Sequence, residues 1–189
     1  MSLNIAQIEE IKSILLEIPD LIKKYDRHDL SFTEGVKDWL TKMERALTNN
    51  RLPQGASIAT FQSLLISVER DIIPEGYTFR KRLTKRKMLE VVSAEILRKA
   101  EELIRYFLQI NMQRIEEAER LARQIAIIVQ RKNLLATIPQ PLTHTQKLQI
   151  LWNTISSDSD LSTAALHLEV LLGKNDAMII IDRQLPELV

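Results

Sequence analysis

The sequence predicts an all-α protein: an elongated helical bundle of about six to seven helices around one very long central helix. Three observations predict this fold class. Leu, Ile, Ala, Glu, Lys, Arg and Gln dominate the composition, and these residues favour helices. Apolar residues recur at three- and four-residue spacing between glycines and prolines, which is typical of amphipathic helices. The segment 84–132 contains neither glycine nor proline, so a single helix is expected there.

Three helices are predicted before the long one. The first covers about 4–25 and has a stripe of isoleucine and leucine residues. Pro19 lies inside this stripe and should kink or split the helix near residues 17–18. The second helix opens at Ser31–Glu34, which matches a capping box, and the third follows the turn that begins at Pro53.

The long helix is predicted to run from about 84 to 132. Glutamate precedes a basic residue by four positions in several pairs, which stabilises an exposed helix face. These pairs are Glu95–Lys99, Glu101–Arg105, Glu116–Arg120 and Glu119–Arg123. Such a helix would reach about 70 Å, whereas a compact chain of this length is roughly 40 Å across. We therefore expect an elongated molecule, a bent helix, or a helix that projects towards another chain.

A smaller helical segment is predicted after Pro139 and Pro141. The expected organisation is a helical bundle at 1–138 and a small C-terminal unit at 143–189, packed on or beside it. Thr143 and Gln146 fit a capping box that begins the first helix of this unit. Gly173 is placed where a glycine ends the next helix.

Composition excludes several classes of protein. The chain has no cysteine, so disulfides, thiolate metal sites and a cysteine nucleophile are excluded. The formal net charge of +1 gives no overall attraction to an anionic partner. The first residues lack the basic and apolar regions of a secretory signal, and the longest apolar runs are too short to span a bilayer. A cytoplasmic location is the expectation.

No motif in the chain points to catalysis. His28, His144 and His167 do not occur in any spacing typical of metal sites. Adjacent glutamates point about 100° apart on a helix, so they cannot act as a catalytic pair. There is no phosphate-binding glycine loop, dinucleotide fingerprint or nucleophile elbow. The prediction is a protein that is not an enzyme, with no catalytic residue, cofactor or metal ligand.

A basic segment precedes and opens the long helix. Six basic residues lie within positions 80–87, and we predict that they contact an anionic partner: Arg80, Lys81, Arg82, Lys85, Arg86 and Lys87. If Thr84 caps the helix, the last three occupy its first turn, where the helix dipole favours acidic residues instead. The segment would then bind the phosphates of nucleic acid without sequence specificity. Two alternatives stay open: an anionic membrane surface, with Tyr77 and Phe79 as anchors, and a solvated loop without a partner.

An apolar surface for a protein partner is predicted on the long helix and near the end of the chain. The helix is apolar on nearly every side between 103 and 110, so we expect burial on several sides. A second apolar cluster near 178–181 fits either the core or a partner helix. The predicted contact residues are Leu103, Ile104, Phe107, Leu108, Ile110, Ile179 and Ile180. The leading functional hypothesis is a non-enzymatic interaction or scaffold protein that self-associates as a homodimer.

Overall fold

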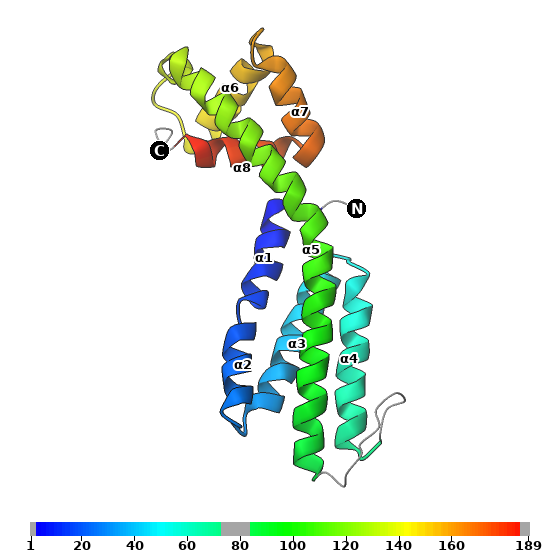
Figure 1. The fold of residues 1–189 in the computed structure, drawn as a ribbon. Helices are drawn as coiled ribbons and strands as arrows, with labels where there is room; N and C mark the ends of the chain where they lie inside the picture. Colours follow the sequence, from blue (N-terminus) through cyan, green and yellow to red (C-terminus); the bar gives the residue numbers. More distant parts are fainter. Residues whose placement is uncertain (1–2, 73–83, 186–189) are drawn as a thin grey trace. The chain divides into compact units, whose positions relative to one another are not determined.

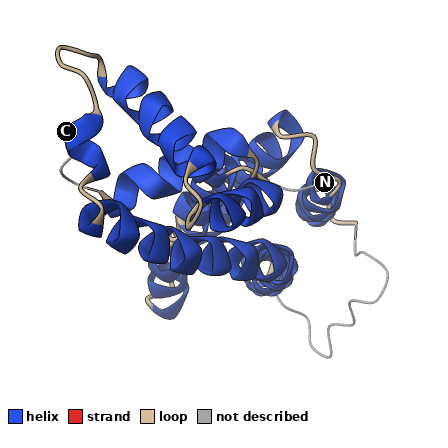
Figure 2. Cartoon of the chain, turned by 90° about the horizontal axis from the view of Figure 1, so that it is seen from above, coloured by secondary structure: helices blue, strands red, loops and turns tan. Residues whose placement is uncertain are grey.

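The computed structural model describes residues 3–72 and 84–185. These residues form helices joined by loops, with no strand among them (Figure 2). The predicted all-α class with one very long helix is confirmed. Contacts divide the chain into two units. We call residues 6–108 the N-terminal unit, and residues 1–5 together with 109–189 the composite unit.

The N-terminal unit is a bundle in which α3 and α4 pack side by side (Figure 1). Its helices are α1 (Ile5–Leu15), α2 (Ile18–Asp26), α3 (Phe32–Asn49), α4 (Gln54–Glu69) and the first part of α5 (Lys85–Arg131). The predicted apolar stripes form the core, because one face of each helix is buried. The largest fully buried side chains of this unit include Trp39, Phe32, Ile11, Met43, Leu65 and Ile96.

The predicted first helix is in fact two helices. α1 ends at Leu15 and α2 begins at Ile18, with Glu17 as its N-cap. Pro19 lies in the first turn of α2. A backbone N–H at this position has no acceptor within the helix, so the absence of an N–H in proline costs no hydrogen bond. Pro19 therefore breaks the predicted helix at the expected position and begins a new one.

One predicted capping box forms and the other does not. The Thr143 side chain accepts a hydrogen bond from the Gln146 backbone, and the Gln146 side chain accepts one from the Thr143 backbone. Ser31 is the N-cap of α3 but makes no side-chain capping bond, so the box predicted with Glu34 is wrong. The physical reason is the backbone of Ser31, whose ψ of 0° is not the extended conformation that a capping side chain requires.

The composite unit combines the second part of α5 with the C-terminal helices. Its remaining elements are the 3-10 helix η1 (Leu134–Thr137), α6 (His144–Ser157), α7 (Ser162–Leu172) and α8 (Lys174–Gln184). Ala118, Ala122 and Ala126 of α5 belong to one core with buried residues of α6, α7 and α8. The prediction ended the first domain at 138, whereas contacts group residues 109–138 with the C-terminal helices. The boundary lies earlier than predicted because the apolar residues of α5 after position 109 are buried in the same core as those of α6, α7 and α8.

Candidate functional site

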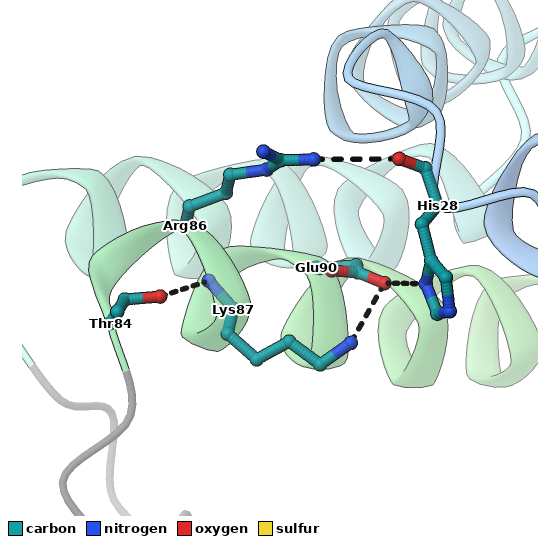
Figure 3. Close-up of polar contacts among 5 residues, drawn as sticks. All are labelled: His28, Thr84, Arg86, Lys87 and Glu90. Atoms are coloured by element: carbon teal, nitrogen blue, oxygen red, sulfur yellow. Dashed lines mark hydrogen bonds and ion pairs between the residues drawn. The ribbon is translucent and has the colours of Figure 1, made fainter.

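The first turn of α5 is basic, as the sequence predicts. α5 begins at Lys85, and its first turn contains no acidic residue. The Thr84 side-chain oxygen accepts a hydrogen bond from the Lys87 backbone N–H at 3.3 Å, so Thr84 caps the helix (Figure 3). Lys85, Arg86 and Lys87 therefore lie at the positive end of the helix dipole, where cationic side chains are disfavoured.

Two of these three cations are paired with carboxylates. Lys85 Nζ lies 2.9 Å from Asp71 Oδ2, and Lys87 Nζ lies 3.0 Å from Glu90 Oε1. These ion pairs offset part of the unfavourable dipole interaction. They also mean that an anionic partner would compete with internal carboxylates for both lysines.

Arg86 has a different partner. Its Nη2 donates to the backbone oxygen of His28 at 3.4 Å, across to the loop that follows α2 (Figure 3). A carbonyl is neutral, so within 3–72 and 84–185 no carboxylate is paired with the Arg86 charge. Arg86 is therefore the basic residue of this turn that is best placed to attract an anion.

Glu90 connects the first turn of α5 to the loop after α2. Its Oε1 is 3.2 Å from His28 Nδ1 as well as 3.0 Å from Lys87 Nζ (Figure 3). The hydrogen bond from Lys87 holds the pKa of the Glu90 carboxyl below its usual value, with a further contribution from His28 and with burial acting in the opposite direction. Glu90 is thus an ionised acceptor for both side chains.

Arg80, Lys81 and Arg82 lie outside the described residues, as do Tyr77 and Phe79. The surface that the structure describes is therefore limited to the residues that begin α5. We call Lys85, Arg86 and Lys87 the basic turn.

The predicted partner surface is only partly exposed. Ile104, Leu108 and Ile180 are buried in the packing of the chain itself, so their assignment to a partner surface is wrong. Ile104 and Leu108 lie one turn apart and face the core of the N-terminal unit, while Ile180 belongs to the core of the composite unit. Leu103 and Phe107 are partly buried.

Ile110 and Ile179 are the exposed members of the predicted surface, at 64% and 41%. They belong to different helices, α5 and α8. The apolar cluster near 178–181 lies mainly in the core, since Ile180 and Ile181 are buried. A place in the core was one of the two alternatives that the sequence left open.

An exposed apolar face that the sequence analysis missed lies on α7. Leu166 and Val170 are four residues apart on this helix and are 64% and 76% exposed. Ala165 and Leu168 on the opposite side are buried in the core of the composite unit. The signal was present in the sequence of α7, which has apolar residues on its exposed side as well as on its buried side, whereas a surface helix usually has a polar outer face.

The N-terminal unit contains a cleft with a volume of about 220 Å³. Its lining is mostly apolar and comes from α2, α3 and α5: Ile18, Ile22, Tyr25, Phe32, Ala94, Leu97, Arg98 and Glu101. Arg98 is paired with Glu102, and Glu101 with Arg105, each along the surface of α5. The charged groups of the cleft therefore do not converge on one point as catalytic groups do.

No known protein family, curated protein or solved structure matches the chain. Its function is therefore inferred from two surfaces, the outer face of α7 and the basic turn. Among residues 3–72 and 84–185, no helix is both long and apolar enough to cross a membrane.

Proposed function

We propose that the chain is a non-enzymatic interaction protein that self-associates through the outer face of α7. The observation that supports this most is the exposure of Leu166 and Val170 on adjacent turns of the same helix. Exposed apolar side chains that gather on one face are typical of protein interaction sites. Burial of one such side chain contributes about 1.5–3 kcal/mol, so pairing two copies of this face is favourable.

The charge of α7 favours a second copy of the chain as the partner. The helix contains one acidic residue, Glu169, and no lysine or arginine, and its His167 lies 3.9 Å from Glu117 of α5. In a two-fold contact the same surface meets itself, so a strongly charged face would repel its own copy. A nearly neutral apolar face avoids this repulsion.

Leu166→Glu combined with Val170→Glu should abolish self-association. The two added carboxylates would lose hydration on burial and would repel those of the second copy. Sedimentation equilibrium should find the unchanged protein as a dimer at concentrations of about 10 µM. The double variant should be a monomer with unchanged helical circular dichroism.

A matched control carries the same charges on a different unit. Leu16→Glu with Leu30→Glu replaces two leucines of the N-terminal unit that are 76% and 74% exposed. This control should dimerise as strongly as the unchanged protein. A monomeric wild-type protein at about 100 µM would contradict self-association, and equal loss in both variants would contradict the assignment to α7.

A second candidate function is sequence-independent binding of nucleic acid through the segment 80–87. The observation in its favour is the basic turn, where three cations lie at a helix N-terminus and, among the described residues, Arg86 contacts a neutral carbonyl in place of a carboxylate. Phosphate oxygens would accept hydrogen bonds from these side chains and reduce the unfavourable interaction with the helix dipole.

Reversing the charges of the basic turn should abolish this binding. The variant carries Lys85→Glu, Arg86→Glu and Lys87→Glu, and the control reverses three exposed arginines later in α5, Arg120, Arg123 and Arg131. Binding is measured by fluorescence anisotropy with mixed-sequence DNA and RNA. If the unchanged protein contacts about six phosphates, its affinity should fall roughly a thousandfold when the salt concentration is raised from about 50 to about 200 mM. Equal loss in both variants would exclude the basic turn as the site. Binding to anionic vesicles but not to DNA or RNA would assign the segment to a membrane surface.

A further inference from the structure

The cleft of the N-terminal unit lies between one face of α2 and one face of α5. The lining residues of each helix are spaced by three or four positions, so each set shares a single face of its helix. They are Ile18, Ile22 and Tyr25 on α2, and Ala94, Leu97, Arg98 and Glu101 on α5. Phe32, the first residue of α3, completes the lining.

The interior of the cleft is apolar. Ile18, Phe32 and Leu97 are buried, and Ala94 contributes only a methyl group where its neighbours carry longer side chains. Ile22 lines the cleft and is still 46% exposed. An apolar molecule in the cleft would therefore cover apolar surface that the chain itself leaves in contact with solvent, which favours binding. Water is a poor occupant, because it needs two or more polar partners.

The charged lining residues offer no counter-ion to a ligand. Arg98 Nη1 lies 2.6 Å from Glu102 Oε1, and Arg105 Nε lies 2.7 Å from Glu101 Oε1. Both ion pairs run along α5, so each charge of the lining already has an opposite charge beside it. A charged ligand would lose hydration in the apolar cleft without gaining such a partner. The chemistry of the cleft therefore favours a neutral ligand.

Tyr25 and Phe32 form an aromatic wall. Their ring centroids are 5.1 Å apart and their planes are inclined by 56°, a tilted arrangement that aromatic pairs favour. A further ring beside them would extend this packing. The Tyr25 hydroxyl makes no hydrogen bond with any other residue among 3–72 and 84–185, so it can bond to a polar group of a ligand.

We propose that the cleft binds a small neutral aromatic molecule of the phenol class, with one ring and a hydroxyl group. An apolar cavity of about 150 Å³ is large enough for benzene. The cleft has a volume of about 220 Å³ and so has room for one ring with a small substituent. The ring packs against Ile22, Tyr25 and Phe32, and the ligand hydroxyl bonds to that of Tyr25. This site uses none of the residues of the α7 face or of the basic turn.

Isoleucine methyl NMR tests the site, because two of the lining residues are isoleucines. With a Kd on the order of 1 mM, as expected for a ligand this small, phenol at about 5 mM should shift the δ1-methyl signals of Ile18 and Ile22 through its ring current. The signal of Ile155, buried in the composite unit, should not move. Benzoate, which carries a negative charge on the same ring, should bind at least about tenfold more weakly.

Filling the cleft should abolish binding. Ala94→Leu extends a side chain into the cleft from α5, so phenol should no longer shift the Ile18 and Ile22 signals. Ala56→Leu makes the same substitution at an exposed position of α4 and should leave the phenol titration unchanged. Circular dichroism establishes that both variants are folded. If phenol bound to folded Ala94→Leu as tightly as to the unchanged protein, the cleft would not be the site.

Tyr25→Phe tests the hydroxyl contact separately, because it keeps the aromatic ring. The affinity for phenol should fall about three- to tenfold, since one hydrogen bond is lost. Toluene, which has no hydroxyl, should bind to both forms equally. Equal loss of affinity for the two probes would refute the hydroxyl contact. The whole proposal would be overturned if neither probe moved the Ile18 and Ile22 signals, or if benzoate bound as tightly as phenol.

Discussion

Replacing Trp39 with alanine should lower the free energy of unfolding of the N-terminal unit by about 3–5 kcal/mol. Trp39 is 1% exposed and is among the largest fully buried side chains. Its indole N–H also donates to the backbone oxygen of Ile14 at 2.8 Å, which connects α3 to the last turn of α1. Alanine would leave a cavity and remove the connection at the same time.

Trp39→Phe separates these two contributions. Phenylalanine fills most of the volume but cannot donate, and the Ile14 oxygen keeps its bond from the Glu17 N–H. We expect a loss of about 1–2 kcal/mol for this variant. Urea denaturation followed by circular dichroism measures both changes. In either variant Trp152 is the remaining tryptophan and lies in the composite unit, so its fluorescence reports that unit separately. A loss below about 1 kcal/mol for Trp39→Ala would contradict the packing described.

Two isoleucines of α5 should respond very differently to the same substitution. Ile104 is 0% exposed, whereas Ile110 is 64% exposed. Ile104→Ala should lower the free energy of unfolding by about 2–5 kcal/mol through the lost burial and the cavity. Ile110→Ala should change it by no more than about 0.5 kcal/mol, because the side chain is already in contact with solvent.

This pair also tests which of the two residues could meet a partner. Both were predicted to lie on one partner surface. Guanidinium denaturation measures their stability, and sedimentation equilibrium on the same samples measures self-association. If Ile104→Ala weakened self-association without loss of stability, its assignment to the core would be refuted.

The long helix could be predicted because its signals are local. It was expected at about 84–132 and runs from Lys85 to Arg131. A stretch without glycine or proline sustains a helix, and a threonine can cap its first turn. The break near Pro19 was predictable for the same reason, since proline restricts the backbone of its own turn.

Several helix ends could not be predicted because they use unexpected residues. Among the helix ends that the structure describes, the end of α7 at Gly173 follows the rule that a glycine ends a helix. The residues after α2, α3, α4 and α5 that take positive φ are His28, Arg51, Asp71 and Asn133, at 52° to 63°. Residues other than glycine rarely adopt this backbone conformation, so the sequence gives no signal for it at these positions. All four residues are exposed, and backbone hydrogen bonds close the helix ends beside them, as between the Leu52 N–H and the Leu47 oxygen at 2.9 Å.

The candidate sites were predictable only where they depend on one helix. The position of Lys85, Arg86 and Lys87 in a first turn follows from the helix start. Their partners Asp71 and His28 come from other parts of the chain and could not be foreseen. The predicted partner surface was wrong at Ile104, Leu108 and Ile180 for the same reason, because an apolar stretch does not reveal which of its sides another helix of the same chain will cover.

The hydrogen bond between Ile5 and Asp176 has a consequence for the time course of synthesis. The carboxylate of Asp176, which accepts the hydrogen bond from the Ile5 backbone N–H, is synthesised 171 positions after Ile5. At about 5–20 residues per second, that interval lasts roughly 10–30 s. The N-terminal unit, residues 6–108, is complete well before then and can fold first. During this interval the core that buries Ile5 lacks its C-terminal helices, so the Ile5 side chain stays exposed on the nascent chain until α8 has been synthesised.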